Sequence, residues 1–373
     1  MQKALNKKIV TAIAVSAALL LPSAVMAKVS GQCGNCHTMH NSQDGISVTT
    51  TGSPNGVLLN TGCIGCHTGT NSGTSTVPYV LDATGVPATT SLAGGNFYWV
   101  ANIADNTGHN VSGVASQDGV LGNTPPGGTG ALTSQLTCGG TMGCHGNQAI
   151  SDEFGAIAGG HHGSGGSTLT ADSTKHFTSG STTDMSDAYR MLAGVIGIED
   201  DDWEYTTASA SDHNQYYGVA RTTETDTAAG SVSNLCASCH GTFHNGAGNV
   251  GATGFNSPWV RHPTDFDMAE ATGTEYAYYN GGDGVNAAPY STAAPVASTI
   301  VNAGASTLAP LGTVNVTAVT ADATAIVTCL SCHRAHGSAN ADLLRWDYTT
   351  MDAHAGTNTN TGCFICHTTK DDI

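Results

Sequence analysis

The twelve cysteines of the chain fall into six pairs, and a histidine directly follows the second cysteine of every pair. Two thiols and an imidazole at the spacing Cys-x-x-Cys-His are typical of covalent c-type haem attachment. The cysteines then form thioethers to the porphyrin, and the histidine binds the iron from the proximal side. Five pairs have this spacing: Cys33/Cys36-His37, Cys63/Cys66-His67, Cys236/Cys239-His240, Cys329/Cys332-His333 and Cys363/Cys366-His367.

The sixth pair is stretched, because five residues separate Cys138 from Cys144 in the run CGGTMGCH that ends at His145. A longer spacer must bulge between its two thioethers. Three of the five spacer residues are glycines, which adopt bulged backbone conformations at low cost. We therefore predict a haem here too, and six covalently attached haem c groups in all.

Disulfides or zinc sites are the other uses of paired cysteines in an exported protein. Neither explains why all six second cysteines are followed by histidine. Zinc motifs of this kind also pair at about 15–20 residues, whereas the first two motifs here begin 30 residues apart.

Ten histidines lie outside the motifs, and six irons with two axial positions would need six of them. His40, His244 and His336 each follow a proximal histidine by three or four residues. So short a segment spans only about 10–14 Å fully extended, too little to reach around the macrocycle, so each is expected to bind a different haem from its own motif. The alternative for these three is a surface histidine on a short helical turn.

His109 and His262 are two further candidate distal ligands, and the spacing says little about either of them. The last distal position is open among five histidines. Those five are His161, His162, His176, His213 and His354, of which His161 is our choice. At most one of the adjacent pair His161 and His162 is expected to bind iron. Histidine at both axial positions of every iron implies low reduction potentials, whereas ligation by one of the eight methionines would raise them.

Residues 1–27 have the basic start, apolar run and small-residue cleavage pattern of a Sec-type signal peptide. Removing them takes the formal charge from −17 to −20, since they hold three lysines and no acidic residue. So acidic a chain repels nucleic acid, and no other run is long enough to predict a membrane span. We expect an exported protein with no membrane span and no nucleic-acid partner.

Residues 28–373 are predicted to form a single hexahaem unit. The chain has 48 glycines among 373 residues and only 10% charged residues, and this composition disfavours an ordinary hydrophobic core made of side chains. The expected fold is mostly irregular coil with few short helices and minor β structure, wrapped around a chain of stacked haems. Short helices are predicted around 33–41, 184–192 and 329–336, a strand or hairpin over 313–328, and loops over 69–96, 112–135 and 281–312.

Several motifs, in order, resemble the hexahaem outer-surface c-type cytochromes of metal-reducing bacteria, the OmcS type, which polymerise into extracellular conducting filaments. They are CGNCHTMHNSQDG from Cys33, NFYWV, GHN at Gly108–Asn110, AYRMLAG at Ala188–Gly194, LCASCHGTFHN, RHP at Arg261–Pro263, VTCLSCHRAHGSA and CFICHTTK. The resemblance spans nearly the whole mature chain. The chain departs from the family at the stretched third site, where the family's additional histidine is absent and His161 or His162 is the candidate replacement.

The resemblance implies a head-to-tail homopolymer in which His40 binds the iron held by Cys329, Cys332 and His333 of the next subunit. It also implies upstream envelope cytochromes as electron donors and metal oxides or other extracellular acceptors as partners.

Three functions are compatible with these motifs. The first is a cell-surface electron conduit that is not an enzyme. A monomeric periplasmic or outer-membrane-associated shuttle shares all the haem evidence and differs only in assembly. A multihaem reductase is the least favoured, because it needs an open iron and basic residues for an anionic substrate, and the mature chain has eight Lys and Arg.

Overall fold

The structure is a computed structural model. It describes residues 29, 31–43, 45–49, 53–87, 92–127, 130–163, 168–169, 176–206, 212–220, 228–241, 250–251, 254–255, 262–271, 279–280, 288–299, 313–314, 325–351 and 361–367. The predicted signal peptide, His244 and His354 lie outside these residues.

The α-helices are short, and three of them carry haem motifs. They are α2 (Cys63–His67), α3 (Tyr98–Asn102), α4 (Glu153–Ala156), α5 (Val232–His240) and α6 (Cys329–Cys332). The Ser231 side chain caps α5 by accepting a hydrogen bond from the Asn234 amide, and Thr328 and Ser331 form a capping box at α6. Serine and threonine thus begin the helices that present the fourth and fifth motifs.

Single turns of 3-10 helix connect much of the remaining backbone. They are η1 (Cys33–Asn35), η2 (Gly56–Leu58), η3 (Asp105–Thr107), η4 (Gly140–Met142), η5 (Met185–Asp187), η6 (Tyr189–Met191), η7 (Met268–Ala271), η8 (Ala341–Leu343), η9 (Tyr348–Thr350) and η10 (Gly362–Ile365).

The strands are two to four residues long. Four form an antiparallel sheet in the order β5 (Thr168–Leu169), β6 (His176–Ser179), β7 (Ile196–Glu199) and β8 (Gln215–Tyr216). The others pair in twos: β1 (Ser42–Gln43) with β2 (Ile46–Ser47), β3 (Thr137–Gly139) with β4 (Gly143–His145), β9 (Val250–Gly251) with β10 (Gly254–Phe255), β11 (Phe266–Asp267) with β14 (Ile326–Val327), and β12 (Ala288–Pro289) with β13 (Thr313–Val314). The predicted fold class, coil with short helices and minor β structure, is confirmed.

Individual elements differ from the predictions. The helix predicted around 33–41 is only η1. The one around 184–192 is interrupted by the extended Ala188, with η5 before it and a turn after it in which Arg190 has a positive φ of 48°. The helix around 329–336 ends at Cys332. The two ends of the predicted 313–328 hairpin, β13 and β14, pair with β12 and β11 instead of each other. The nine-residue helix α5 was not predicted.

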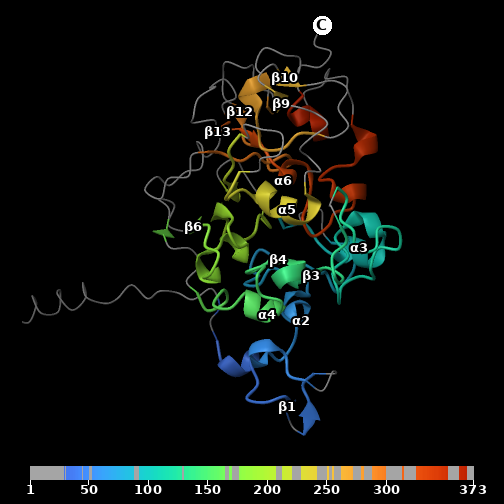
Figure 1. Cartoon of the computed structure of the whole chain (residues 1–373), viewed down its shortest axis with the longest axis vertical. Helices are drawn as coiled ribbons and strands as arrows, with labels where there is room; N and C mark the ends of the chain where they lie inside the picture. The colour runs from blue at the N-terminus through green and yellow to red at the C-terminus, as the bar shows by residue number, and fades with distance from the viewer. Residues whose placement is uncertain are drawn as a thin grey trace, which may run out of the picture.

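Successive motifs follow one another along the molecule (Figure 1). The hairpin β1–β2 lies at the tip of a projection at one end, and α2, the β3–β4 pair, α5 and α6 come next along the long axis. The side-chain core is divided into small clusters, the two largest having eight and six buried residues. None of the helices in the described segments has the length and apolar character needed to cross a membrane.

Candidate haem sites

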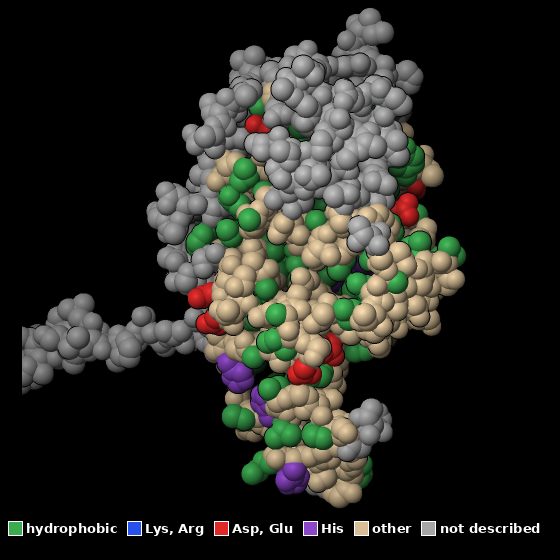
Figure 2. All heavy atoms as spheres, viewed as in Figure 1, with side chains coloured by type: hydrophobic (Ala, Val, Ile, Leu, Met, Phe, Trp, Pro, Cys, Tyr) green, Lys and Arg blue, Asp and Glu red, His purple; other side chains and the backbone are tan. Residues whose placement is uncertain are grey.

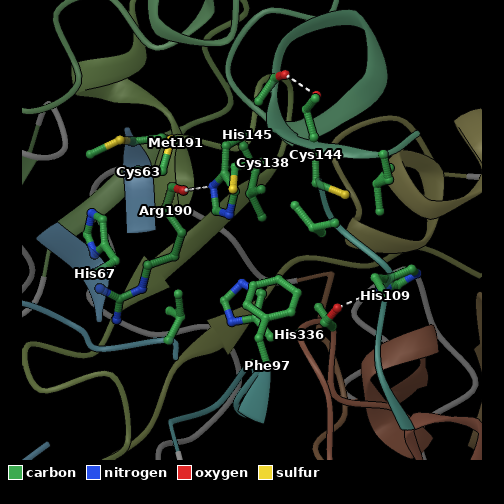
Figure 3. Close-up of a pocket in the computed structure, with 18 of the residues that line it drawn as sticks. Cys63, His67, Phe97, His109, Cys138, Cys144, His145, Arg190, Met191 and His336 are labelled. Carbon is green, nitrogen blue, oxygen red and sulfur yellow. Dashed lines mark hydrogen bonds between the residues drawn. The ribbon is translucent and has the colours of Figure 1, made fainter. Parts of the chain in front are cut away.

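A single cavity of about 2350 Å³ runs through the molecule and is lined by residues of the first five motifs. Cysteines and the histidine of each of these motifs line it, together with His109, His161, His162 and His336. Figure 3 shows part of this cavity, where His67, His145 and His336 come from different segments and surround one space. Sites that are far apart in the sequence therefore open into one continuous volume.

Five pairs of imidazoles face each other at nearly the same separation. Each pair joins a motif histidine to a histidine outside the motifs: His37 with His162 (5.9 Å between ring centroids), His67 with His161 (6.2 Å), His145 with His336 (6.2 Å), His240 with His109 (6.1 Å) and His367 with His262 (6.1 Å).

This separation fits one metal ion between two imidazole nitrogens. Metal–imidazole bonds are about 2 Å long, and the ring centroid lies roughly 1 Å behind the bonded nitrogen, so two axial imidazoles place their centroids about 6 Å apart. The residues present therefore fit a bis-histidine haem iron at five of the six motifs.

The geometry differs from the expectation that at most one of His161 and His162 is a ligand, because each of them faces a motif histidine. The two side chains face different motif histidines, His67 and His37. Adjacent residues rarely reach one iron, but these two serve two neighbouring sites. His162, which the sequence offers as an alternative to His161, is thus a candidate ligand beside it.

The other predicted distal ligands have different outcomes. His109, His262 and His336 lie in the pairs above, as expected from the sequence. His336 faces the third motif and not its own, in agreement with the argument from chain reach. His40 is exposed near the tip of the projection, and its Nδ1 lies 3.1 Å from Ser42 Oγ. Histidine side chains are visible on this projection in the space-filling view (Figure 2).

Two further histidines have other surroundings. His213 is buried and stacks on Tyr290 with 3.7 Å between ring centroids. His176 lies in β6 and lines the cavity.

Backbone carbonyls hold the proximal imidazoles through Nδ1. The distances are 3.0 Å from His37 to Val57 O, 2.9 Å from His67 to Pro78 O, 3.0 Å from His145 to Arg190 O, 3.0 Å from His240 to Pro126 O and 2.7 Å from His333 to Asp342 O. A carbonyl accepts only from a protonated nitrogen, so Nδ1 carries the proton and Nε2 is available to a metal.

Burial favours the neutral form of three cavity imidazoles, His109, His145 and His336. Desolvation lowers the pKa of His109 and of His145, and desolvation together with the neighbouring His145 and His109 lowers the pKa of His336 to about 3. A neutral imidazole is the form that binds a metal.

Cysteines of consecutive motifs lie close together. The sulfurs of Cys63 and Cys138 and a Glu153 oxygen lie within 4.8 Å of one another. Cys236 lies close enough to Cys329 for each thiol to shift the pKa of the other, and electrostatic interactions likewise couple Cys36 to Cys66, Cys144 to Cys239 and Cys332 to Cys363. The six motifs are therefore neighbours in space in the same order as in the sequence.

The stretched third motif is a compact loop. Its two cysteines lie on β3 and β4, which pair in parallel, with η4 between them. Gly140 has a φ of +77°, and a Cβ atom at Gly143 would lie 2.5 Å from the Gly139 nitrogen. The glycines are thus required by the bulge, as the sequence predicts.

Two arginines that the sequence reasoning missed lie between the fifth motif and the Leu92–Ala93 segment. Arg334 donates to the carbonyl of Leu92 at 2.8 Å, and Arg345 donates to that of Leu330 at 2.6 Å. Burial and the neighbouring Arg345 lower the pKa of Arg334 to about 10. Within the described part of the chain neither guanidinium forms an ion pair with a carboxylate. Two half-buried, like-charged groups of this kind fit an anionic ligand.

Comparison with known proteins agrees with the motifs. The family described as Doubled CXXCH motif matches residues 321–372, which hold the last two motifs. The C-type cytochrome OmcS of Geobacter sulfurreducens is 29% identical over an alignment of 408 residues that covers 94% of this chain and 88% of that protein.

Two solved structures from Geobacter sulfurreducens are also similar. The Outer Membrane Cytochrome S filament has 22% identity and a TM-score of 0.48, covering 86% of this chain and 85% of that one. The OmcS nanowires solved by cryo-EM have 23% identity and a TM-score of 0.43, with coverages of 85% and 84%. From the sequence identity over nearly the whole chain and from the doubled motif, the predicted resemblance to the OmcS type of multihaem c-type cytochrome is confirmed.

Proposed function

We propose that this protein is a hexahaem electron-transfer cytochrome that polymerises head to tail outside the cell and conducts electrons to an external acceptor. The main support for the proposal is the set of five imidazole pairs. They belong to motifs that are neighbours in space, one after another, along the molecule. Haem supplies reversible one-electron chemistry, and the protein supplies ligation, spacing and a low-dielectric surrounding.

In this proposal the chain saturates its irons with histidine. The six motif histidines are the proximal ligands, and His162, His161, His336, His109 and His262 are the distal ligands of sites one, two, three, four and six. A saturated iron leaves no position for a substrate, so the role proposed is electron transfer and not catalysis.

The distal ligand of the fifth site is proposed to be His40 of the adjacent subunit. His40 is exposed and does not line the cavity, and its Nδ1 lies 3.1 Å from the Ser42 hydroxyl, which leaves Nε2 available to a metal. A head-to-tail contact that does not close on itself generates a helical filament, and a ligand supplied across it fixes the register. A monomeric shuttle, the main alternative, needs no such ligand from a second copy.

Arg334 and Arg345 are proposed to bind haem propionates. They provide two half-buried cations beside the fifth motif, and a propionate carboxylate would supply a directly bonded counter-charge. Charge-assisted hydrogen bonds of this type are among the stronger ones in proteins. In the same proposal residues 28–373 form one unit, exported with the aid of residues 1–27, which receives electrons from envelope cytochromes.

Intact mass of the purified native protein tests the cofactor part of the proposal. We expect six covalent haems per chain, and five for the Cys138→Ala/Cys144→Ala variant, because the third site alone loses its thioethers. Equal haem content in the native and variant proteins would show that the stretched motif is not a haem site.

Replacing His162 with alanine should open one iron. We expect the His162→Ala protein to keep six haems but to show a high-spin fraction of about one sixth and to bind CO when reduced. His176→Ala removes a cavity-lining histidine that is in none of the five pairs, and it should leave the spectrum unchanged. A His162→Ala protein that stays fully low-spin and does not respond to CO would contradict the assignment.

A further inference from the structure

Three short turns with an unusual backbone recur in the chain. Val57–Leu58, Arg190–Met191 and Asp342–Leu343 are consecutive pairs with φ between 48° and 59°. They account for six of the ten non-glycine residues with positive φ among the described residues. A leucine follows each pair, namely Leu59, Leu192 and Leu344. L-amino acids other than Gly, Asn and Asp rarely adopt this left-handed conformation, and β-branched residues such as Val57 avoid it most strongly.

The three turns make the same two hydrogen bonds to three different haem motifs. The carbonyl of the first left-handed residue accepts from Nδ1 of the proximal histidine: Val57 from His37, Arg190 from His145 and Asp342 from His333. The carbonyl of the second accepts from the backbone amide after that histidine, at 2.8 Å for Leu58 with Thr38, 2.7 Å for Met191 with Gly146 and 2.9 Å for Leu343 with Arg334. One structural unit thus repeats at the first, third and fifth sites.

The second and fourth sites use a different support. There the proximal Nδ1 atoms of His67 and His240 face the carbonyls of Pro78 and Pro126, and neither proline is in a left-handed turn. The support of the proximal ligand therefore alternates along the first five sites.

Packing against other side chains does not explain why Val57 occupies such a turn. Its side chain lines the cavity and is 57% exposed, so little burial among other side chains offsets its backbone strain. Backbone strain of this kind persists where the surrounding structure holds it, and it concentrates at functional sites. What all three turns share is a pair of successive carbonyls aimed at one motif.

We propose that these left-handed turns are positioning elements for the proximal histidines of alternate haems. Their first carbonyl fixes the imidazole plane and makes the imidazole a stronger electron donor, because a hydrogen bond from Nδ1–H increases the basicity of Nε2. A more basic ligand stabilises ferric iron, so the turns lower the reduction potentials of the first, third and fifth haems. This inference rests on the proposed haem ligation.

The first turn offers a matched pair of variants. Proline fixes φ near −65°, so Val57→Pro moves the carbonyl out of position. Among the residues that the structure describes, the Val57 amide donates no backbone hydrogen bond that the proline would remove. Val57→Asn/Leu58→Gly places in the turn the residues that favour the left-handed geometry, so it keeps the carbonyl in place. At the fifth site, Asp342→Pro is the variant that moves the carbonyl, and Leu343→Gly is the control that keeps it in place.

Redox titration followed optically, with EPR of the ferric protein and intact mass to count haems, tests the proposal. We expect each proline variant to keep six haems, to move about one sixth of the redox amplitude to higher potential and to change one low-spin EPR signal. The Asn–Gly and Leu343→Gly variants should match the native protein. Proline variants with native potentials and EPR, or glycine-containing variants shifted equally, would overturn the proposal.

If a proline variant loses a haem, the structure of the native haem-loaded protein tests the proposal instead. The proposal requires the Val57 carbonyl within hydrogen-bonding distance of His37 Nδ1 there, and a carbonyl pointing elsewhere would overturn it. Absence of haem from the native protein would instead contradict the proposed function, so the two failures are distinguishable.

Discussion

Replacing His40 with alanine should abolish the filament and leave six haems on every chain. His40 is exposed on a projection outside the cavity, so its loss disturbs none of the five imidazole pairs. In the assembled state the fifth iron would lose its distal ligand, and the contact between subunits would lose the bond that fixes its register. Electron microscopy and sedimentation of protein sheared from the cell surface measure the outcome.

His176→Ala is the control for His40→Ala, since it also removes one histidine but from β6 inside the body. It should form filaments as the native protein does. The His40→Ala protein should sediment as a monomer with a high-spin fraction of about one sixth. Filaments of His40→Ala with an unchanged low-spin spectrum would show that the ligand between subunits is not His40.

A chain exported without covalent haem should fail to fold. The largest cluster of buried side chains has eight residues, and much of the interior is the cavity of about 2350 Å³. A plate that buries roughly 400 Å² of apolar surface stabilises by about 10 kcal/mol at ~25 cal/mol per Å². That value is as large as the whole stability of a typical domain, about 5–15 kcal/mol, so the loss of six plates leaves too little to offset the chain entropy.

Far-UV circular dichroism and limited proteolysis of protein made in cells that lack haem attachment measure this effect. We expect no cooperative thermal transition and cleavage throughout the chain, whereas the haem-loaded protein melts cooperatively and resists cleavage. A haem-free chain with a cooperative transition would show that side chains alone form the core.

The sequence predicted the chemistry of the sites better than the elements that hold them. Cys-x-x-Cys-His is a local pattern whose meaning is independent of the fold, so the cysteines and proximal histidines could be read directly. The pairing of His162 with His37 or of His336 with His145 depends on contacts over 100 residues or more. No periodicity encodes such contacts.

The missed features have physical causes. A helix is predicted around 184–192, but Arg190 and Met191 adopt positive φ, and their carbonyls face the third motif. Arg334 follows His333 directly and is one of eight basic residues in the mature chain. The small number of basic residues is a sequence signal for an anion-binding role of Arg334. The sequence does not show that Arg345 lies beside Arg334, and the role becomes evident only from that contact.

Cryo-EM of the native protein sheared from the cell surface tests the central claim most directly. We expect filaments with six haems per subunit in motif order, and continuous density from His40 to the iron bound by His333 of the next subunit. Discrete particles in which every iron is ligated from within one chain would contradict it, and would make the protein a monomeric electron shuttle.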